Sequence, residues 1–365
     1  MRLRAEFDEK VARVRRLAEE KKLDGILIAG VANFRWLSSG ALNVVSRQAV
    51  QGEVALYVTQ DAVHLLANVI EMPRLLEQDF TGLPVEAHVF PWYQSLAEQV
   101  WKLPGSRRGS DIPLPGLVAL GDEVRSLRYP MTSYEVERYM ELGRDAARVI
   151  EDVMAGVQPG MTGRQIMAKV DGALLEAGIL PIVSLVGIDD PVLKYRHPIP
   201  NDRPFHHTAM MVSCAERHGL IVALTRTVHN GRLSDEARQH HHRVQRVLSE
   251  MVAATKPGRK VADVLSHAQA VYERLGYPGE WQKHHQGGGI GYETRDFIAT
   301  PQSTEVVHSG QAFAWNPSIP GYKAEDTFLI TDSGPVLVTA SGGPWPRSEI
   351  TVGELTLSQA DILEL

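Results

Sequence analysis

An internal duplication constrains the fold of this chain more than any other feature. The sequence predicts a helix over about 133–157, a Pro-Gly turn and a second helix, and it repeats this order from about residue 235. The prolines and glycines at the turns and helix ends of the first copy lie 98 positions before their equivalents in the second. The three pairs are Pro159 and Pro257, Gly160 and Gly258, and Gly178 and Gly276. Three matches at one offset indicate a duplicated unit.

Strand-like segments follow each pair of predicted helices: Ala209–Cys214 and Leu220–Leu224 after the first, Ala312–Trp315 and Thr327–Ile330 after the second. The second part of the chain is therefore predicted to contain two related α/β halves, with a cleft between their sheets.

The part before the duplication has a different pattern. Apolar residues at helical spacing predict an amphipathic helix over 6–22. Buried strands are predicted at Gly25–Ala29, Ala55–Val58 and Val63–Leu66, and loops between Leu103 and Pro115. We expect a small α/β domain over 1–128 and the duplicated domain over 129–365.

Composition narrows the function classes. Lys and Arg number 38 against 44 Asp and Glu, for a net charge of −6, so nucleic acid is not expected as a partner. The single cysteine, Cys214, excludes an intrachain disulfide and a multi-thiolate zinc site. The polar start and the lack of any run of 18 apolar residues predict a cytoplasmic protein with no membrane partner.

Histidines are concentrated in one region, with eleven of the fourteen between His197 and His285. His197 lies among prolines that stiffen its loop, and an imidazole suits proton transfer near neutral pH. His284, His285 and Gln286 precede three consecutive glycines, a wall where backbone N–H groups can approach a ligand. A phosphate cradle and a tight strand crossing are the alternatives.

These features, with five short segments, resemble the creatinase, prolidase and Xaa-Pro aminopeptidase family. In chain order the segments are Tyr195-Arg196-His197-Pro198, Leu224-Thr225-Arg226-Thr227, His285–Gly291, Asn316-Pro317 and Glu325-Asp326. The resemblance covers nearly the whole chain and implies an α+β fold class, in which the second domain is a pita-bread domain with pseudo-twofold symmetry.

By this resemblance, peptidases of the family hold two metal ions with two Asp, one His and two Glu. Four of the five positions here lack such a donor: Val212, Ala223, Gly288 and Asn316. Only Glu325 remains, so we expect no metal cofactor. A rebuilt site that uses His218, His284, His285 and Glu325 stays open as an alternative.

Creatinase, in the same family, hydrolyses a C–N bond without metal, and the resemblance places its acid–base histidine at His197. Creatinase also has alanine at the position of Ala223. It carries glutamates at the positions of Thr225 and Asn316, which hold its cationic substrate. Creatine itself is therefore not the expected substrate.

Several polar residues are candidates for substrate binding beside the histidines. Arg295 and Arg226 can each bind a carboxylate through two N–H groups, or pair internally with Asp296 or Glu325. Asn316 can stabilise an oxyanion.

The catalytic candidates are His197, His285 and Glu325. Glu325 can orient a histidine or a water, or form a structural ion pair with Lys323. The candidates for substrate binding are His284, Gln286, Gly288, Arg295, Asn316, Arg226 and Arg47.

The sequence thus predicts a hydrolase that cleaves an amide or amidine C–N bond in a small polar substrate without metal. The first alternative is a metal-dependent Xaa-Pro dipeptidase or aminopeptidase with atypical ligands. The second is a catalytically inactive pita-bread domain used for protein binding. The resemblance also implies a homodimer, in which Arg47 reaches a substrate across the interface.

Overall fold

The computed structural model describes residues 2–46, 48–189, 192 and 194–365. Contacts divide the chain into two compact units, Met1–Tyr134 and Glu135–Leu365, and we describe each unit by itself. The division falls between residues 134 and 135, whereas the sequence analysis placed it between 128 and 129. No described helix has the length and apolar character needed to cross a bilayer.

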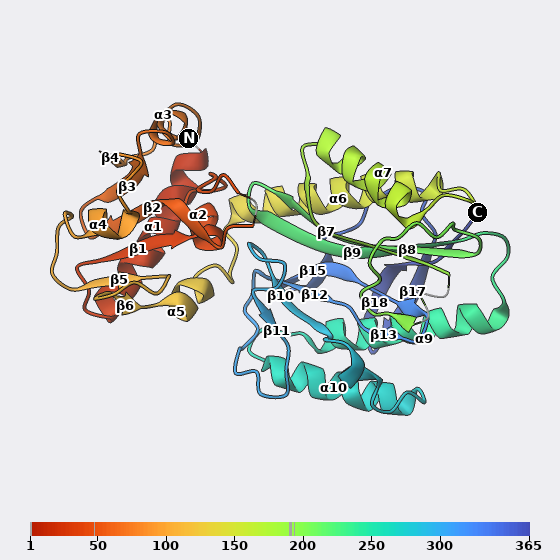
Figure 1. Cartoon of the computed structure of the whole chain (residues 1–365). Coiled ribbons are helices and arrows are strands. Elements are labelled where there is room, and N and C mark those ends of the chain that lie inside the picture. Colours follow the sequence, from red (N-terminus) through yellow and green to blue (C-terminus); the bar gives the residue numbers. More distant parts are fainter. Residues whose placement is uncertain (1, 47, 190–191, 193) are drawn as a thin grey trace. The chain divides into compact units, whose positions relative to one another are not determined.

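Unit one is built on a six-stranded mixed sheet with the strand order β4-β3-β2-β1-β5-β6 (Figure 1). Its strands are β1 (Gly25–Gly30), β2 (Gln51–Thr59), β3 (Val63–Asn68), β4 (Glu86–Phe90), β5 (Arg108–Ser110) and β6 (Val118–Ala119). Its helices are α1 (Arg2–Glu20), α2 (Val31–Leu37), α3 (Met72–Arg74), the π-helix η1 (Leu75–Asp79), α4 (Leu96–Val100) and α5 (Gly121–Ser126).

The predicted elements of unit one are present. Helix α1 buries Phe7, Val11 and Val14, which recur at helical spacing. One short strand, β5, lies in the stretch that was expected to be loop. Parallel pairing with β1 supplies its backbone hydrogen-bond partners, so it forms a strand despite its glycine and its one charged residue, Arg108.

The first half of unit two packs two helices against an antiparallel sheet. The helices are α6 (Ser133–Ala155) and α7 (Gly163–Glu176), and the strands are β7 (Leu180–Ile188), β8 (Thr208–Arg217) and β9 (Leu220–His229). A short C-terminal strand, β19 (Leu363–Glu364), adds to β9 in parallel.

The second half repeats this plan. Its helices are α9 (Asp235–Ala254), α10 (Val261–Arg274) and the 3-10 helix η2 (Glu280–Lys283). Its sheet contains β10 (Gly287–Ile290), β11 (Phe297–Ile298), β12 (Gln311–Trp315), β15 (Asp326–Thr331) and β16 (Gly334–Leu337), in the order β11-β10-β12-β15-β16. Two hairpins complete it: β13 (Ser318–Ile319) with β14 (Tyr322–Lys323), and β17 (Arg347–Val352) with β18 (Leu355–Ala360).

The two halves match in backbone detail. Gly160 and Gly258 both have positive φ, 92° and 84°, and each N–H donates to a later carbonyl, of Phe205 or Val307. Gly178 and Gly276 end the second helix of each half, also with positive φ. The predicted duplication is confirmed, because equivalent residues make equivalent turns.

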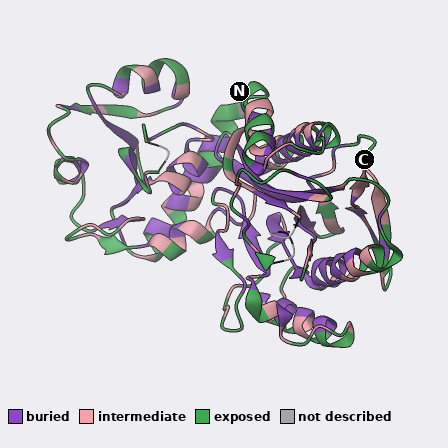
Figure 2. Cartoon of the chain, turned by 45° about the vertical axis from the view of Figure 1, so that its right-hand side comes forward, coloured by how far each residue is buried: buried purple, intermediate pink, exposed green. Residues whose placement is uncertain are grey.

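The two sheets meet where β9 passes β15. The Thr327 hydroxyl hydrogen bonds the backbone N–H and C=O of Ala223 at 2.9 Å each, and the Thr225 N–H donates to the Glu325 carbonyl at 3.0 Å. Figure 2 shows buried residues gathered on these strands and on the inward faces of the helices. This junction holds the candidate site.

Candidate active site

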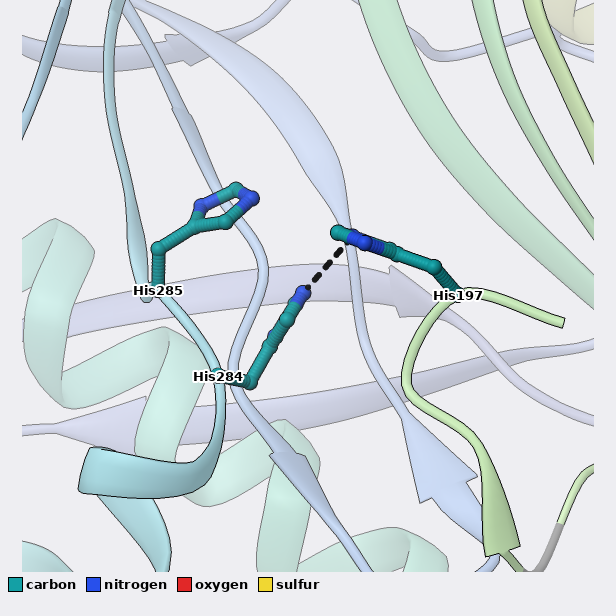
Figure 3. A group of neighbouring side chains, drawn as sticks. All are labelled: His197, His284 and His285. Atoms are coloured by element: carbon teal, nitrogen blue, oxygen red, sulfur yellow. Dashed lines mark hydrogen bonds between the residues drawn. The ribbon is translucent and has the colours of Figure 1, made fainter.

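Three imidazoles converge in unit two from two segments far apart in the sequence (Figure 3). His197 lies in the loop between β7 and β8, while His284 and His285 follow η2. The Nε2 atoms of His197 and His284 are 3.1 Å apart. The His285 ring lies 5.7 Å from the His197 ring and 4.6 Å from the His284 ring, between centroids. His197, the residue predicted to transfer the proton, thus lies next to His284 and His285, which were also predicted to belong to the site.

All three imidazoles favour the neutral form. Burial, followed by the charge of Lys323, lowers the pKa of His284 to about 2. Burial and then Arg295 lower the pKa of His285 to about 4. The pKa of His197 is also lowered, by partial burial and by Lys323. At neutral pH each of these rings is therefore neutral and has one nitrogen with a free lone pair.

His284 positions His197. Its Nδ1 lies 3.4 Å from the Ser318 hydroxyl, and its Nε2 lies 3.1 Å from His197 Nε2, within hydrogen-bond distance. The low pKa of His284 keeps that ring neutral at neutral pH. We therefore place His284 as a positioning residue rather than as a substrate ligand.

Glu325 is held by two cations. Its Oε1 accepts from Arg295 Nη2 at 2.9 Å, and its Oε2 lies 2.8 Å from Lys323 Nζ and 2.7 Å from Thr225 Oγ1. Glu325 is 3% exposed. Burial alone would raise its pKa, but Lys323 and Arg295 outweigh burial and lower the pKa to about 2.

These contacts select one of the roles considered for Glu325. The carboxylate forms a buried ion pair with Lys323, the partner named from the sequence, and with Arg295. Its hydrogen bonds to Thr225 and Arg295 reach no imidazole among the described residues. Glu325 acts on the histidines through its charge, which appears among the influences on the pKa of each ring.

The described residues do not fit a pair of divalent ions. The positions that the resemblance gives for metal ligands carry two aliphatic side chains, a glycine and an amide: Val212, Ala223, Gly288 and Asn316. Glu325, the fifth, already has both oxygens bound by Lys323, Arg295 and Thr225. Two divalent ions there would meet the ammonium and guanidinium charges at short range.

The glycine stretch serves the sheet rather than a ligand. A Cβ on Gly288 would lie 2.0 Å from the Phe297 carbonyl oxygen, and one on Gly287 would lie 2.1 Å from that of Ala314. Strand β10 pairs with β11 on one side and β12 on the other. The glycines are needed for this close approach, which is the tight strand crossing given as an alternative from the sequence; a role of Gly288 in substrate binding stays a prediction.

Two further candidates are fully engaged inside the protein. Arg226 is 1% exposed and binds Glu151 at 2.7 Å and Asp326 at 3.0 Å. The Gln286 amide accepts from the Tyr272 hydroxyl at 2.8 Å and donates to backbone carbonyls. Both residues therefore stabilise the core, and we do not retain them as substrate ligands.

Three buried polar atoms of other candidates have no hydrogen-bond partner among the described residues: His285 Nδ1, Arg295 Nε and Asn316 Oδ1. Buried polar groups are costly without a partner, so these atoms remain candidates for contacting a substrate. His218 lies in the β8–β9 turn, roughly 20 Å along the strand from Thr225, and takes no part in the cluster. Arg47 lies outside the described residues.

Lys323 is the site residue whose importance the sequence analysis understated. It precedes Glu325 by two positions, and alternate residues of an extended segment share a face. Lys323 also borders a cavity of about 200 Å³. Other residues that line this cavity are Asp189, His207, Thr227, His229, Leu233 and Tyr322.

Comparisons with known proteins agree with this architecture. The model of metallopeptidase family M24 matches residues 137–332. An uncharacterized peptidase from Staphylococcus saprophyticus is 24% identical over 235 residues, which span 60% of this chain and 66% of that relative. A Xaa-Pro dipeptidase from Pyrococcus horikoshii is 22% identical over 368 residues, spanning 90% of this chain and 96% of the relative. The prolidase structure from Pyrococcus horikoshii OT3 has a TM-score of 0.77 at 20% identity, covering 91% of this chain and 98% of that one.

The two facing sheets define a pita-bread protein of the creatinase and prolidase class. The chain belongs to metallopeptidase family M24. This confirms the resemblance, the α+β fold class and the assignment to hydrolases that act on carbon–nitrogen bonds.

Proposed function

We propose that the protein hydrolyses a C–N bond in a small polar substrate without metal, with His197 as the general acid and base. The observation that carries the proposal is the ion pair of Glu325 with Lys323 and Arg295 at 2.8 and 2.9 Å. In this ion pair, Lys323 and Arg295 contact Glu325, the one carboxylate that remains of the metal ligands implied by the family resemblance.

The proposed reaction balances on protein groups alone. His197 removes a proton from water as the water oxygen bonds to the amide or amidine carbon. The negative charge that develops on the former carbonyl or amidine group faces Arg295 and Lys323. His197 then returns the proton to the nitrogen as the C–N bond breaks, which regenerates the neutral imidazole.

The metal-dependent alternative retains one supporting feature. The ring nitrogens of His197, His284 and His285 lie within 4.8 Å of one another, a spacing that allows one transition-metal ion. The charge of Lys323 lowers the pKa of all three rings and that of Arg295 lowers the pKa of His197 and His285, and both charges also oppose a bound cation. We therefore favour the metal-free reaction.

The test is a substrate panel with protein that has been dialysed against a chelator. Xaa-Pro dipeptides, N-acyl amino acids and guanidino acids are each assayed for the released amine, with and without EDTA. We expect turnover of one class that EDTA leaves unchanged. His197→Ala should lower kcat/KM by roughly 10²- to 10⁴-fold. His206→Ala, an exposed histidine of the same segment, is the control.

Each other outcome counts against the proposal. Turnover that requires added Mn²⁺ or Co²⁺ would establish the metal-dependent alternative. Near-normal turnover by His197→Ala would remove its assigned role. No turnover of any class would favour the inactive, protein-binding alternative.

We also propose, from the family resemblance, that the protein acts as a homodimer. Light scattering should then give twice the chain mass of 40.3 kDa. A mass equal to one chain would contradict this.

A further inference from the structure

A second group of ligand-type side chains lies in unit one, on two parallel strands at the edge of the sheet. Strand β3 presents His64 and the edge strand β4 presents Glu86 and His88. His64 pairs in register with Glu86. Alternate residues of a strand share a face, so His88 projects on the same side as Glu86. All three residues belong to unit one.

The atoms of this group have the spacing of metal ligands. His64 Nδ1 lies 3.0 Å from His88 Nε2 and 3.2 Å from Glu86 Oε2, and the three donor atoms lie within 4.8 Å of one another. Zn²⁺ binds imidazole nitrogen and carboxylate oxygen at about 2.0–2.2 Å, which puts tetrahedral ligands roughly 3.3 Å apart. The observed separations need only a small expansion to admit such an ion.

Hydrogen bonding alone leaves this group incompletely satisfied. One proton on His64 Nδ1 would be divided between the lone pairs of His88 and Glu86. His64 Nδ1 is the ring nitrogen that faces His88 Nε2 and Glu86 Oε2, whereas Nε2 is buried with no hydrogen-bond partner among the described residues. A cation would engage all three lone pairs at once.

We propose that His64, Glu86 and His88 bind one divalent transition-metal ion of the Zn²⁺ type. Two imidazoles and a carboxylate form a ligand set that suits such ions. His64 is buried against the Tyr57 ring, whereas the Glu86 side chain is 65% exposed. Solvent therefore completes the coordination on the Glu86 side. The ion would tie the edge strand β4 to β3 and stabilise unit one.

The experiment uses the full chain after removal of metal by a chelator. Zn²⁺ is titrated in competition with a chromophoric chelator, and Co²⁺ binding is followed by visible absorption. The titrations are repeated with His197→Ala/His284→Ala protein, which removes the imidazole cluster of unit two. We expect this double variant to retain one high-affinity equivalent that raises the melting temperature.

Variants of the proposed ligands test whether His64, Glu86 and His88 bind the ion. In the double-variant background, Glu86→Gln and His88→Ala should each weaken Zn²⁺ binding by at least about tenfold. His242→Ala, an exposed histidine on α9, should not. Glu86→Gln changes an exposed side chain and should leave the melting temperature of metal-free protein unchanged. Affinities for Glu86→Gln and His88→Ala within twofold of the His242→Ala value would overturn the proposal.

Discussion

Lys323 is the residue on which the electrostatics of the cleft depend most. Its ammonium contacts Glu325 at 2.8 Å, and its charge lowers the pKa of His197 and of His284. An ammonium at contact distance satisfies a buried carboxylate as a metal ion would, but it adds only one positive charge. The side chain therefore serves both the stability of the cleft and the neutrality of its imidazoles.

Lys323→Ala should destabilise the protein by roughly 3 kcal/mol, because it leaves the buried Glu325 charge with one cation fewer. Lys283→Ala is the matched control, since Lys283 pairs with Glu280 at 2.6 Å but is 64% exposed. This control variant should lose less than about 1 kcal/mol of stability. Urea unfolding measures the free energy of unfolding of both variants. Equal losses of stability would show that the buried Lys323–Glu325 pair stabilises the protein no more than the exposed Lys283–Glu280 pair.

His284 should make stability depend on pH. Its folded pKa of about 2 lies below the ordinary value of 6.5, so the unfolded chain binds more protons below pH 6.5. The contribution is fully present above pH 6.5 and is lost as the pH falls, at up to about 1.4 kcal/mol per pH unit. His284→Asn should therefore flatten the stability curve between pH 6.5 and about 4.5.

Denaturant unfolding across this pH range provides the measurement. His242→Asn, which changes an exposed histidine, should leave the slope unchanged. A His284→Asn curve parallel to that of the unchanged protein would contradict the buried, neutral state of His284.

Sequence reasoning about single residues succeeded where the interaction was local. The Lys323 and Glu325 pair could be predicted because two positions in an extended segment share a face. The partners of Arg226 could not all be predicted, since Glu151 lies 75 residues away on another element. Contacts between residues far apart in the sequence cannot be predicted from local patterns. The sequence also does not distinguish a buried arginine from one that binds a substrate.

At the scale of elements, strand β10 explains the glycine stretch. Its glycines allow the neighbouring backbones of Phe297 and Ala314 to approach. Before the fold is known, a missing side chain leaves room equally for a ligand or for another strand. The glycines in the sequence indicate a close approach to the backbone, but they do not show whether a ligand or another strand makes that approach.

Gly288→Ala should destabilise the protein by at least about 3 kcal/mol, because the new methyl group would overlap the Phe297 carbonyl oxygen. Gly172→Ala on α7 is the control, since a Cβ there meets nothing within 4 Å. That change should be neutral or stabilise by up to about 1 kcal/mol. Thermal unfolding compares the two, and a Gly288→Ala melting temperature equal to the control would refute the packing role.

For the whole molecule, the duplication predicted the architecture well. Punctuating glycines and prolines at one offset require equivalent turns, and Gly160 and Gly258 make them. The contact of His197 with His284 could not be predicted from the separate elements, because the loop and η2 meet only when the two halves face each other. Hydrophobic periodicity specifies elements, whereas the contacts between halves depend on tertiary packing.

The central claim is that protein cations occupy the surroundings of Glu325 where relatives are expected to hold metal. Anomalous diffraction from crystals of the full chain soaked in Mn²⁺ or Zn²⁺ tests this claim most directly. We predict no anomalous peak within about 3 Å of the Glu325 carboxylate, the reach of a metal–oxygen bond, with Lys323 and Arg295 still in contact with it. Two peaks bridged by Glu325, with Lys323 displaced, would contradict the account.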